Sequence, residues 1–404
     1  MSSLNSQAIR GGIGGTDQLD RFIRRIDQLE YGSLELRVAG RSYLLNGHHP
    51  GPAASIEIHK FGSLARRLMF NGDLGLAEAY INADWDTPNL TDLLVLLAQN
   101  RHRLTKTENP SLIGRLAMRL FHWRRRNSLA GSARNIMAHY DLGNAFYAQW
   151  LDWGMTYSSG IFIEAGEGLE SAQANKYQRI LDLLDAKPGD RILEIGCGWG
   201  GFAVTAASQG MLVDGITLSP SQLAWAQRRV EALDLTDRVN LSLKDYRKLN
   251  GNYDHIVSIE MFEAVGEAYW SDYMDTLKAN LKPGGRAALQ VITIDDHQFE
   301  SYRRTPDFIQ RYIFPGGMLP ADRHLRSLPQ AAGLHVTRDD RFGLDYAKTL
   351  QLWRRNFEQS WETVRALGFD ERFRRMWRYY LSYCEAGFKA GTIDLHQVLL
   401  TNPD

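Results

Sequence analysis

Leu193-Glu-Ile-Gly-Cys-Gly-Trp-Gly-Gly201 is the stretch that decides the fold of this 404-residue chain. A strand-like run over 191–195 leads into its glycines, and a helix-compatible run over 202–208 follows them. A glycine-rich turn between a strand and a helix lets the backbone approach a ligand closely and directs free N–H groups toward it. A second strand-like run lies at 211–218. The pattern predicts a site for an adenosine-bearing cofactor in a doubly wound sheet.

Strand-like and helix-like runs alternate around this turn, as they do in proteins with a parallel sheet. Ser219 suits a helix N-cap, and Pro220 suits the first helical position that follows it. The predicted strands are 191–195, 212–217, 239–243, 253–259 and 286–293, and the predicted helices are 133–151, 169–184, 202–209, 220–233 and 269–280.

The end of the second strand narrows the identity of the cofactor. A nicotinamide enzyme would carry an acidic residue there to hold the ribose hydroxyls, but this strand ends in Gly215-Ile-Thr-Leu-Ser219, and Asp214 lies too early. The turn Leu281-Lys-Pro-Gly-Gly-Arg286 is instead similar to one found in S-adenosylmethionine-dependent methyltransferases. We therefore predict an α/β fold with a seven-stranded, Rossmann-like class I methyltransferase domain and a smaller N-terminal mixed domain.

The composition is that of an ordinary globular protein, with 44% hydrophobic and 23% charged residues and a net charge of zero. Without a global positive field, nucleic acid is not an expected partner. Two cysteines, Cys197 and Cys384, indicate a reducing compartment without a disulfide framework. The N-terminal segment lacks the apolar core of a signal peptide, and the longest aliphatic run, 93–98, is too short to span a bilayer.

The chain is expected to have four parts. Residues 1–15 are predicted to be disordered, 16–100 to form the small domain with lipid contact, 101–130 to form a basic linker or arm, and 131–404 to form the methyltransferase domain with acyl-chain-binding insertions. Within the small domain we expect helices at 17–30, 61–71 and 75–81 and strands at 33–38, 41–45 and 54–59.

The segment from Arg101 to Arg126 carries eight lysines and arginines and one acidic residue, Glu108. With Leu120, Phe121 and Trp123 interleaved, it fits a surface helix that touches anionic lipid headgroups, although a solvated basic face is an equal alternative. We expect a cytoplasmic protein that associates peripherally with the inner membrane face, and a homodimer is one assembly to test.

Ordered motifs spread over 135–400 point to a family. They are Tyr140-Asp-Leu-Gly-Asn144, Tyr157-Ser-Ser-Gly160, Ile216-Thr-Leu-Ser219 with Gln222, Asp245-Tyr-Arg247, Met261-Phe-Glu-Ala-Val-Gly266, Tyr312-Ile-Phe-Pro-Gly-Gly317, Phe342-Gly343, Asp345-Tyr346 and Tyr379-Tyr380. Together with the glycine turn, they resemble the cyclopropane-fatty-acyl-phospholipid synthase family.

The resemblance implies methyl transfer from S-adenosylmethionine to a cis double bond in an unsaturated phospholipid acyl chain. It also implies a cofactor pocket, to which the glycine turn adds Glu194 and Gly200. The expected cofactor-binding residues are Tyr157, Ser158, Glu194, Gly196, Gly198, Gly200, Thr217, Gln222, Asp245 and Tyr246. Packing alone also explains Gly200 and Tyr246. No metal ion is expected.

In the family pattern, a bound bicarbonate takes the proton that is lost after methyl transfer, held by a cysteine, a glutamate, a histidine, a tyrosine and a backbone amide. This sequence keeps Glu263 and Tyr346 of that set. It departs from the pattern at three positions: Ser159 stands in place of the cysteine, Gln290 in place of the histidine, and Glu260 in place of a glycine. A bound bicarbonate is therefore doubtful.

A carboxylate at position 260 would repel an anion in this pocket, by roughly 4 kcal/mol per close pair at an effective dielectric of about 20. We hypothesise that Glu260 replaces bicarbonate as the proton acceptor, with Glu263 as its orienting or proton-sharing neighbour. Two carboxyl groups this close should titrate as a coupled pair, one of them with a raised pKa. A base fixed to the protein favours a methylene- or methyl-branched product.

Other interpretations remain. Glu260 could instead cap a helix while the enzyme makes ordinary cyclopropanes. Cys384 occupies a cysteine position of the family and is a candidate catalytic residue, with packing as the alternative. A nucleic-acid methyltransferase is disfavoured because Ser258-Ile-Glu-Met-Phe-Glu263 is acidic. A methyltransferase of soluble metabolites and a non-catalytic lipid-binding protein also stay open.

Overall fold

The computed structural model describes residues 17–104 and 142–403. The chain divides into two compact units, 1–114 and 115–404. The predicted disordered segment 1–15 and most of the basic segment 101–130 lie outside the described residues, so disorder, linker and lipid contact stay predictions. The same holds for the first part of the predicted helix 133–151.

The first unit has a mixed four-stranded sheet with strand order β2-β1-β3-β4. Strand β1 pairs antiparallel with β2 and parallel with β3. The helix break predicted between 71 and 75 is present, because α2 contains a non-helical residue, Gly72, with φ +52°. The elements are α1 (Asp17–Ile26), β1 (Tyr31–Val38), β2 (Arg41–Asn46), β3 (His49–Ile58), α2 (Phe61–Ile81), β4 (Trp85–Asp86), α3 (Leu90–Gln99) and α4 (Arg101–Leu104).

The second unit is built on a seven-stranded sheet with strand order β10-β11-β9-β8-β5-β6-β7. Strands β5 to β9 pair in parallel, and β11 runs antiparallel to both β9 and β10. The strands are β5 (Arg191–Ile195), β6 (Leu212–Thr217), β7 (Val239–Leu243), β8 (Tyr253–Ile259), β9 (Leu281–Ile294), β10 (His335–Arg341) and β11 (Ile393–Thr401). The predicted seven-stranded methyltransferase sheet is confirmed.

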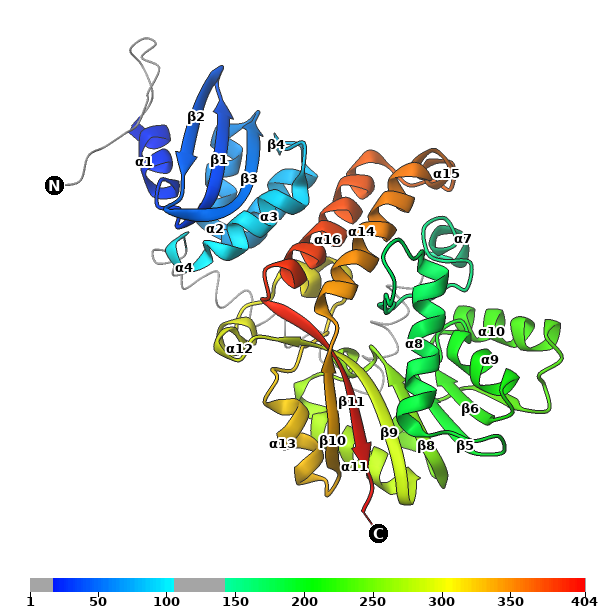
Figure 1. The fold of residues 1–404 in the computed structure, drawn as a ribbon. Helices are drawn as coiled ribbons and strands as arrows, with labels where there is room; N and C mark the ends of the chain where they lie inside the picture. The colour runs from blue at the N-terminus through cyan, green and yellow to red at the C-terminus, as the bar shows by residue number, and fades with distance from the viewer. Residues whose placement is uncertain (1–16, 105–141, 404) are drawn as a thin grey trace. The chain divides into compact units, whose positions relative to one another are not determined.

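Alternate residues of the strands face two separate cores. Ile192 and Val257 pack with α8 (Leu169–Leu184), α9 (Gly201–Ser208) and α10 (Pro220–Ala232). Leu193 and Ile256 face the other way, toward α11 (Trp270–Asn280) and α13 (His324–Ala331). The two groups of helices therefore cover opposite faces of the sheet, as Figure 1 shows.

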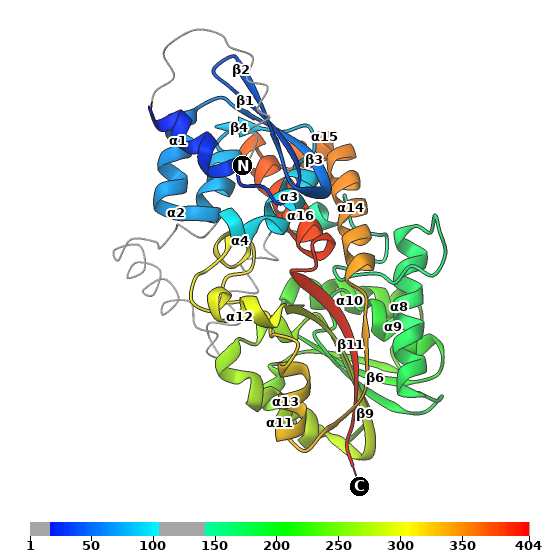
Figure 2. The same ribbon diagram turned by 60° about the vertical axis from the view of Figure 1, so that its left-hand side comes forward.

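The strand order reverses between β8 and β5, the first strand of the sheet in the chain. In open α/β sheets the ligand binds at such a switch point, outside the carboxyl ends of the strands. The long helices α14 (Gly343–Gln359) and α16 (Glu371–Lys389) lie side by side in both ribbon views, with α15 (Trp361–Ala366) between them in sequence (Figure 2). The remaining short elements are α7 (Asn144–Tyr147), α12 (Asp296–Tyr302) and the turns 246–248, 262–264, 267–269 and 309–313.

Two helix predictions are wrong in extent. The predicted helix 17–30 ends at Ile26, where the chain turns toward β1. The described part of the predicted helix 133–151 contains only α7. Trp150 and Leu151 leave the helix and bury their side chains, Trp150 against Trp353 and Trp377, so tertiary packing overrides the local helical pattern.

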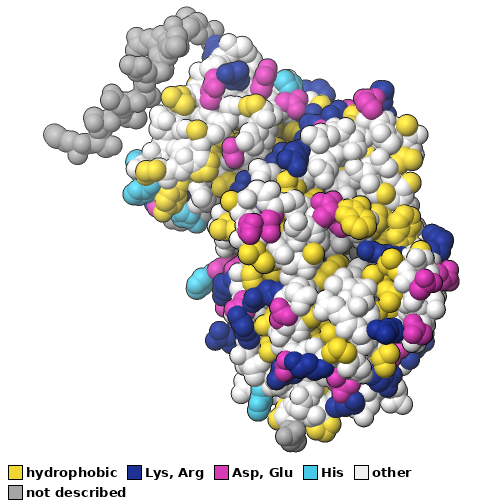
Figure 3. Space-filling model, turned by 45° about the vertical axis from the view of Figure 1, so that its right-hand side comes forward, with side chains coloured by type: hydrophobic (Ala, Val, Ile, Leu, Met, Phe, Trp, Pro, Cys, Tyr) yellow, Lys and Arg dark blue, Asp and Glu magenta, His cyan; other side chains and the backbone are white. Residues whose placement is uncertain are grey.

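Charges of both signs are interspersed over the face in Figure 3, as equal totals of 47 basic and 47 acidic residues allow. Among the described residues, no helix is both long and apolar enough to cross a bilayer.

Candidate functional site

The glycine turn joins β5 to α9 at the carboxyl edge of the sheet. Gly196, Gly198 and Gly200 have φ values of +89°, +51° and +81°, in the left-handed region that favours glycine. At Gly196 a Cβ would come within 2.9 Å of the Met261 side chain, so close packing is a second reason for glycine at this position. The amides of Gly196 and Cys197 both bond the Ile216 carbonyl at 2.9 Å, which fixes the turn against β6.

Glu194 supplies an acidic group beside this turn. Its side chain is 4% exposed, and its Oε2 has no hydrogen-bond partner among the described residues. Burial raises the pKa of Glu194 to about 8, and the charge of Lys176 opposes that shift only in part. A buried carboxyl group with an unpaired oxygen beside a glycine-lined turn fits the hydroxyls or amine of an adenosine-bearing cofactor.

The predicted residues on the neighbouring strands lie at the same edge. Thr217 Oγ1 lies 3.1 Å from Gln222 Oε1, so these two polar groups are already paired. Burial raises the pKa of Asp245, but hydrogen bonds from Arg247 outweigh it and lower that pKa overall. Tyr246 is 8% exposed and packs edge-on against Tyr273, which supports its packing role.

Tyr157 and Ser158 approach from the segment that precedes α8. The Tyr157 hydroxyl lies 2.8 Å from that of Tyr380. The Ser158 hydroxyl accepts a 2.6 Å bond from Lys176 Nζ. These contacts keep both residues beside the sheet edge, but Ser158 is occupied by a protein donor.

The side chain of Glu260 is the centre of a convergent set of donors. Its Oε1 accepts bonds from the backbone amide of Ser159 and from Gln290 Nε2, each 2.8 Å long. Its Oε2 accepts a 2.5 Å bond from the Tyr346 hydroxyl. The structure thus brings together four of the six predicted catalytic residues, and three of them donate to the fourth.

Ser159 takes part through its backbone. Its hydroxyl donates to the Gly160 carbonyl at 2.9 Å, while its amide holds Glu260. The side chain at this position, chosen from the sequence because it replaces a cysteine, therefore does not contact the carboxylate.

The backbone at Glu260 is strained. Its φ is +51°, in a region that costs an L-residue about 1–2 kcal/mol and costs glycine little. It directly follows β8, where its amide bonds the Gln290 carbonyl at 2.8 Å. The strained turn aims the carboxylate at Ser159, Gln290 and Tyr346 rather than along the sheet.

Opposing effects act on the pKa of Glu260, which is raised overall. Burial raises its pKa, opposed by the Tyr346 hydrogen bond, the charge of Lys176 and the bonds from Ser159 and Gln290. Burial and the carboxylate of Glu260 raise the pKa of Tyr346 well above its usual value, so that hydroxyl stays a donor. The hydrogen bonds that Glu260 accepts therefore stabilise its ionised form and offset part of the effect of burial.

Glu263 does not orient Glu260, contrary to one part of the hypothesis. Its Oε1 accepts a 2.5 Å bond from the Ile292 amide, and its Oε2 has no partner among the described residues. Burial and the nearby charge of Glu260 raise the pKa of Glu263 to about 8. The expected coupling is present as a Coulomb interaction, but the orienting bonds come from other residues because Glu263 turns toward the β9 backbone.

Cys384 lies on α16, close enough to the Tyr346 and Tyr380 hydroxyls for their charges to interact. Burial raises the pKa of its thiol far above the usual value, so no thiolate nucleophile forms near neutral pH. The structure favours its packing role.

Lys176 is a site residue that sequence reasoning missed. It is fully buried on α8, and burial lowers its pKa to about 8 while Glu260, Asp152 and Glu194 oppose that shift. Its ammonium donates to the Ser158 hydroxyl, and its charge acts on the carboxyl groups of both Glu194 and Glu260. The sequence did contain a signal for its burial. Lys176 lies four residues after Ala172 and four before Ile180, which places it on the buried face of this helix.

Comparisons with known proteins identify the family and agree with the fold. The sequence model of the family "Mycolic acid cyclopropane synthetase" matches residues 127–398. The chain is 37% identical to tuberculostearic acid methyltransferase UfaA1 of Mycobacterium tuberculosis, over 90% of this chain and 87% of that protein. It is 36% identical to the cyclopropane-fatty-acyl-phospholipid synthase of Escherichia coli K12, over 88% of this chain and 89% of that protein.

Solved structures agree as well. The cyclopropane synthase MmaA2 of Mycobacterium tuberculosis has a TM-score of 0.63 at 31% identity, covering 67% of this chain and 98% of that one. Mycolic acid cyclopropane synthase CmaA1, complexed with SAH and CTAB, has the same TM-score at 30% identity and covers the same shares of both chains.

Proposed function

The chain belongs to the mycolic acid cyclopropane synthetase family of S-adenosylmethionine-dependent enzymes that methylate or cyclopropanate lipid acyl chains, and from this membership we propose its particular reaction. It methylates the cis double bond of an unsaturated phospholipid acyl chain. Glu260 accepts the proton that is lost, and the product carries a methylene or, after reduction, a methyl branch. The observation that carries the proposal is the set of three donors on Glu260.

S-Adenosylmethionine supplies an electrophilic methyl group on a sulfonium. Gly196, Gly198 and Glu194 at the β5 edge, with Thr217 and Gln222 on the next strand and helix, are the residues to hold it. Among these, Glu194 is the best fitted to bond the cofactor, because its Oε2 has no partner within the part of the chain that the structure describes.

An alkene is a weak nucleophile, so the protein assists mainly by holding the reactants together in a preorganised field. A methyl added at one alkene carbon leaves positive charge on the other. The carboxylate of Glu260 stabilises that charge, and the buried Lys176 supplies an opposite charge that acts on Glu260.

The fate of the proton sets the product. A hydride shift brings the positive charge to the branched carbon, and loss of a methyl proton to Glu260 then leaves a methylene (C=CH2) branch on the open chain. Without the hydride shift, loss of a methyl proton with bond formation between the added methyl carbon and the positively charged former alkene carbon gives a cyclopropane. A saturated methyl branch further needs two electrons and two protons, which a separate reductase must supply.

Bicarbonate does not fit beside Glu260. Positions 159, 290 and 346 correspond to the cysteine, histidine and tyrosine that hold bicarbonate in the family pattern, and here the Ser159 amide and the Gln290 and Tyr346 side chains are bound to a carboxylate of this chain. A second anion would find its donors occupied and would be repelled by roughly 4 kcal/mol at a dielectric of about 20. The relative named as a tuberculostearic acid methyltransferase supports methylation, whereas the Escherichia coli relative is named as a cyclopropane synthase.

The first test identifies the product. We expect purified enzyme with S-adenosylmethionine and vesicles of mono-unsaturated phospholipid to form a methylene-branched acyl chain, read by mass spectrometry after methyl-ester derivatisation. The rate should be unchanged in buffer freed of carbon dioxide. A cyclopropane product that requires added bicarbonate would refute the proposal.

The second test is the pH dependence of turnover. Only the ionised carboxylate accepts a proton, so kcat should fall as the pH drops through the raised pKa of Glu260. The fall of kcat toward acidic pH, called here the acid limb, should therefore have its midpoint at a higher pH than the usual pKa of a glutamate. Measurement of kcat at saturating lipid from about pH 5 to about pH 9 gives its midpoint. A rate that stays constant at acidic pH would contradict the role of Glu260.

A further inference from the structure

A line of hydrogen bonds connects Glu260 to the outer face of α8. Arg179 Nε donates to Gln397 Oε1 at 2.9 Å, and Gln397 Nε2 donates to Gln290 Oε1 at 2.9 Å. Gln290 Nε2 then donates to Glu260 Oε1 at 2.8 Å. The two glutamines are register partners on β9 and β11, and each is 1% exposed.

The chemistry of the two ends fixes the direction of this line. A guanidinium has only donors, so Gln397 must present its carbonyl oxygen to Arg179 and its amino group to Gln290. Gln290 must then present its oxygen to Gln397 and its amino group to Glu260. The Ser159 carbonyl, 3.3 Å from Gln290 Nε2, supports the same orientation.

We propose that Arg179 and Gln397 are positioning residues for the proton acceptor, because together they hold the Gln290 amide in the orientation that donates to Glu260. The inference rests on the proposed function of Glu260. Without that constraint, a Gln290 amide turned by 180° would place its oxygen against the carboxylate, where two acceptors repel each other.

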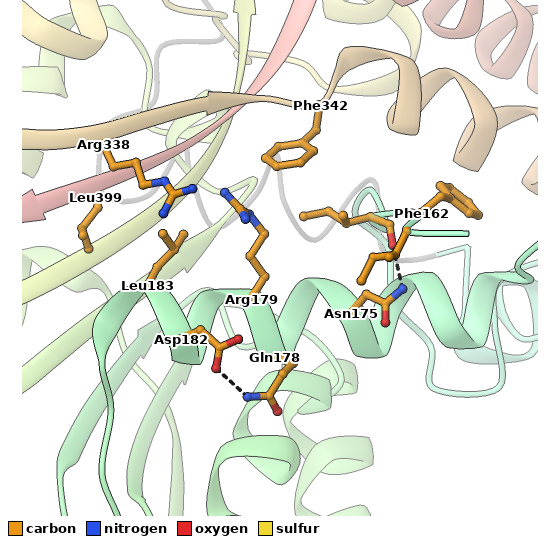
Figure 4. Close-up of a pocket in the computed structure, with 11 residues that line it drawn as sticks. Phe162, Asn175, Gln178, Arg179, Asp182, Leu183, Arg338, Phe342 and Leu399 are labelled. Carbon is orange, nitrogen blue, oxygen red and sulfur yellow. Dashed lines mark hydrogen bonds between the residues drawn. The ribbon is translucent and has the colours of Figure 1, made fainter. Parts of the chain in front are cut away.

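Arg179 is itself held firmly. Its guanidinium forms an ion pair with Asp340 and lies over the Phe342 ring, 4.9 Å from the ring centre. Arg338 Nε also bonds Asp340, at 2.6 Å. In Figure 4, Arg179 rises from α8 toward Arg338 and Phe342 at the wall of a cavity of about 600 Å³. Its side chain is 27% exposed, so the outer end of the line can be altered with little risk to the core.

Other charged groups also act on Glu260 and must be separated from this effect. Lys176 on α8 and Tyr346 on α14 lower its pKa, and Glu263 carries the nearest further carboxyl group. None of these three belongs to the line of amides. Substitutions at Gln397 and Arg179 leave all three in place.

The test compares the acid limb of kcat in three variants. Gln397→Glu keeps the size of the side chain and its bond to Arg179 but cannot donate when ionised, so Gln290 turns toward it. We expect the limb to move up by about one pH unit, the size of one lost hydrogen bond to a charged group. Gln397→Leu removes the bond to Gln290, and Arg179→Met removes the donor that fixes the orientation of Gln397; in both variants the Ser159 carbonyl still favours the donating orientation of Gln290, and we expect about half that shift.

The control is Gln178→Leu, which changes the residue before Arg179 at the same cavity and removes a 2.8 Å bond to Asp182 and a 3.0 Å bond from Gln209, neither of which belongs to the line. It should leave the limb unchanged, and binding of S-adenosylhomocysteine and the thermal midpoint show that each variant is folded. If Glu260→Gln stops turnover but no Gln397 or Arg179 variant moves the limb, the positioning inference is overturned and the proposed function stands. If Glu260→Gln leaves turnover intact, the proposed function itself fails.

Discussion

Glu260→Gly is expected to convert this enzyme into one that depends on bicarbonate and forms cyclopropane. Without bicarbonate, turnover should fall by on the order of 100-fold or more, because the proton acceptor is gone. Added bicarbonate should restore much of the rate, and the restored product should be a cyclopropane.

The reason lies in what the substitution leaves behind. The Ser159 amide, Gln290 and Tyr346 all point at the position of the removed carboxylate, so an anion with similar oxygens can bind them. Removing the carboxylate also removes the repulsion that excludes such an anion. The backbone tolerates the change, because φ at position 260 is +51° and glycine adopts this conformation without strain.

Glu260→Ala is the matched control. It removes the same carboxylate but keeps a Cβ and the strain of about 1–2 kcal/mol at this φ. We expect weaker rescue by bicarbonate than in the glycine variant. The rate is measured against bicarbonate concentration in buffer freed of carbon dioxide, with the product read by mass spectrometry. If bicarbonate rescues neither variant, the three donors do not form an anion site.

Much of the sheet could be predicted because its signals are local. The strands 191–195, 212–217, 239–243 and 253–259 are found at the predicted residues, each bounded by turn or cap residues that the sequence displays. The Ser219 cap is present, with its side chain accepting a bond from the Gln222 amide. Local rules do not place β10 and β11, because β11 pairs antiparallel with β9, where Gln290 and Gln397 are 107 residues apart, and β10 pairs antiparallel with β11 in turn.

Prediction of the site was limited in the same way, because some of its contacts depend on pairing between distant strands. Glu260 and Gln290 stood out because each departs from a family pattern, and the parallel pairing of β8 with β9 then places Gln290 opposite Ile259. Gln397 carries no such departure, and its role follows from lying opposite Gln290 on β11. The role of Ser159 could not be predicted from its side chain, because its backbone amide is the group that donates to Glu260. The orienting role predicted for Glu263 is wrong because its carboxyl group accepts a bond from the Ile292 amide and makes none to Glu260.

Glu260→Gln is the most direct test of the base, and Glu263→Gln is its matched control. An amide cannot accept the proton, so we expect Glu260→Gln to lower kcat by about 10²–10⁴-fold, the usual worth of a general base. Binding of S-adenosylmethionine, measured by calorimetry, should stay near the wild-type value because Glu194 and the glycine turn are untouched. This binding measurement distinguishes a variant that has lost the chemical step from one that no longer binds the cofactor.

Glu263→Gln makes the same chemical change a few residues away with a different expected result. The pKa of Glu263 is raised to about 8, so near neutral pH this carboxyl group is mainly protonated, and an amide of similar shape replaces a neutral group. Its Oε1 can still accept the bond from the Ile292 amide. We therefore expect most of the turnover to remain, with a small downward shift of the acid limb as a potential negative charge beside Glu260 is removed. Equal losses in both variants would mean that the two carboxyl groups share the proton and that neither alone is the acceptor.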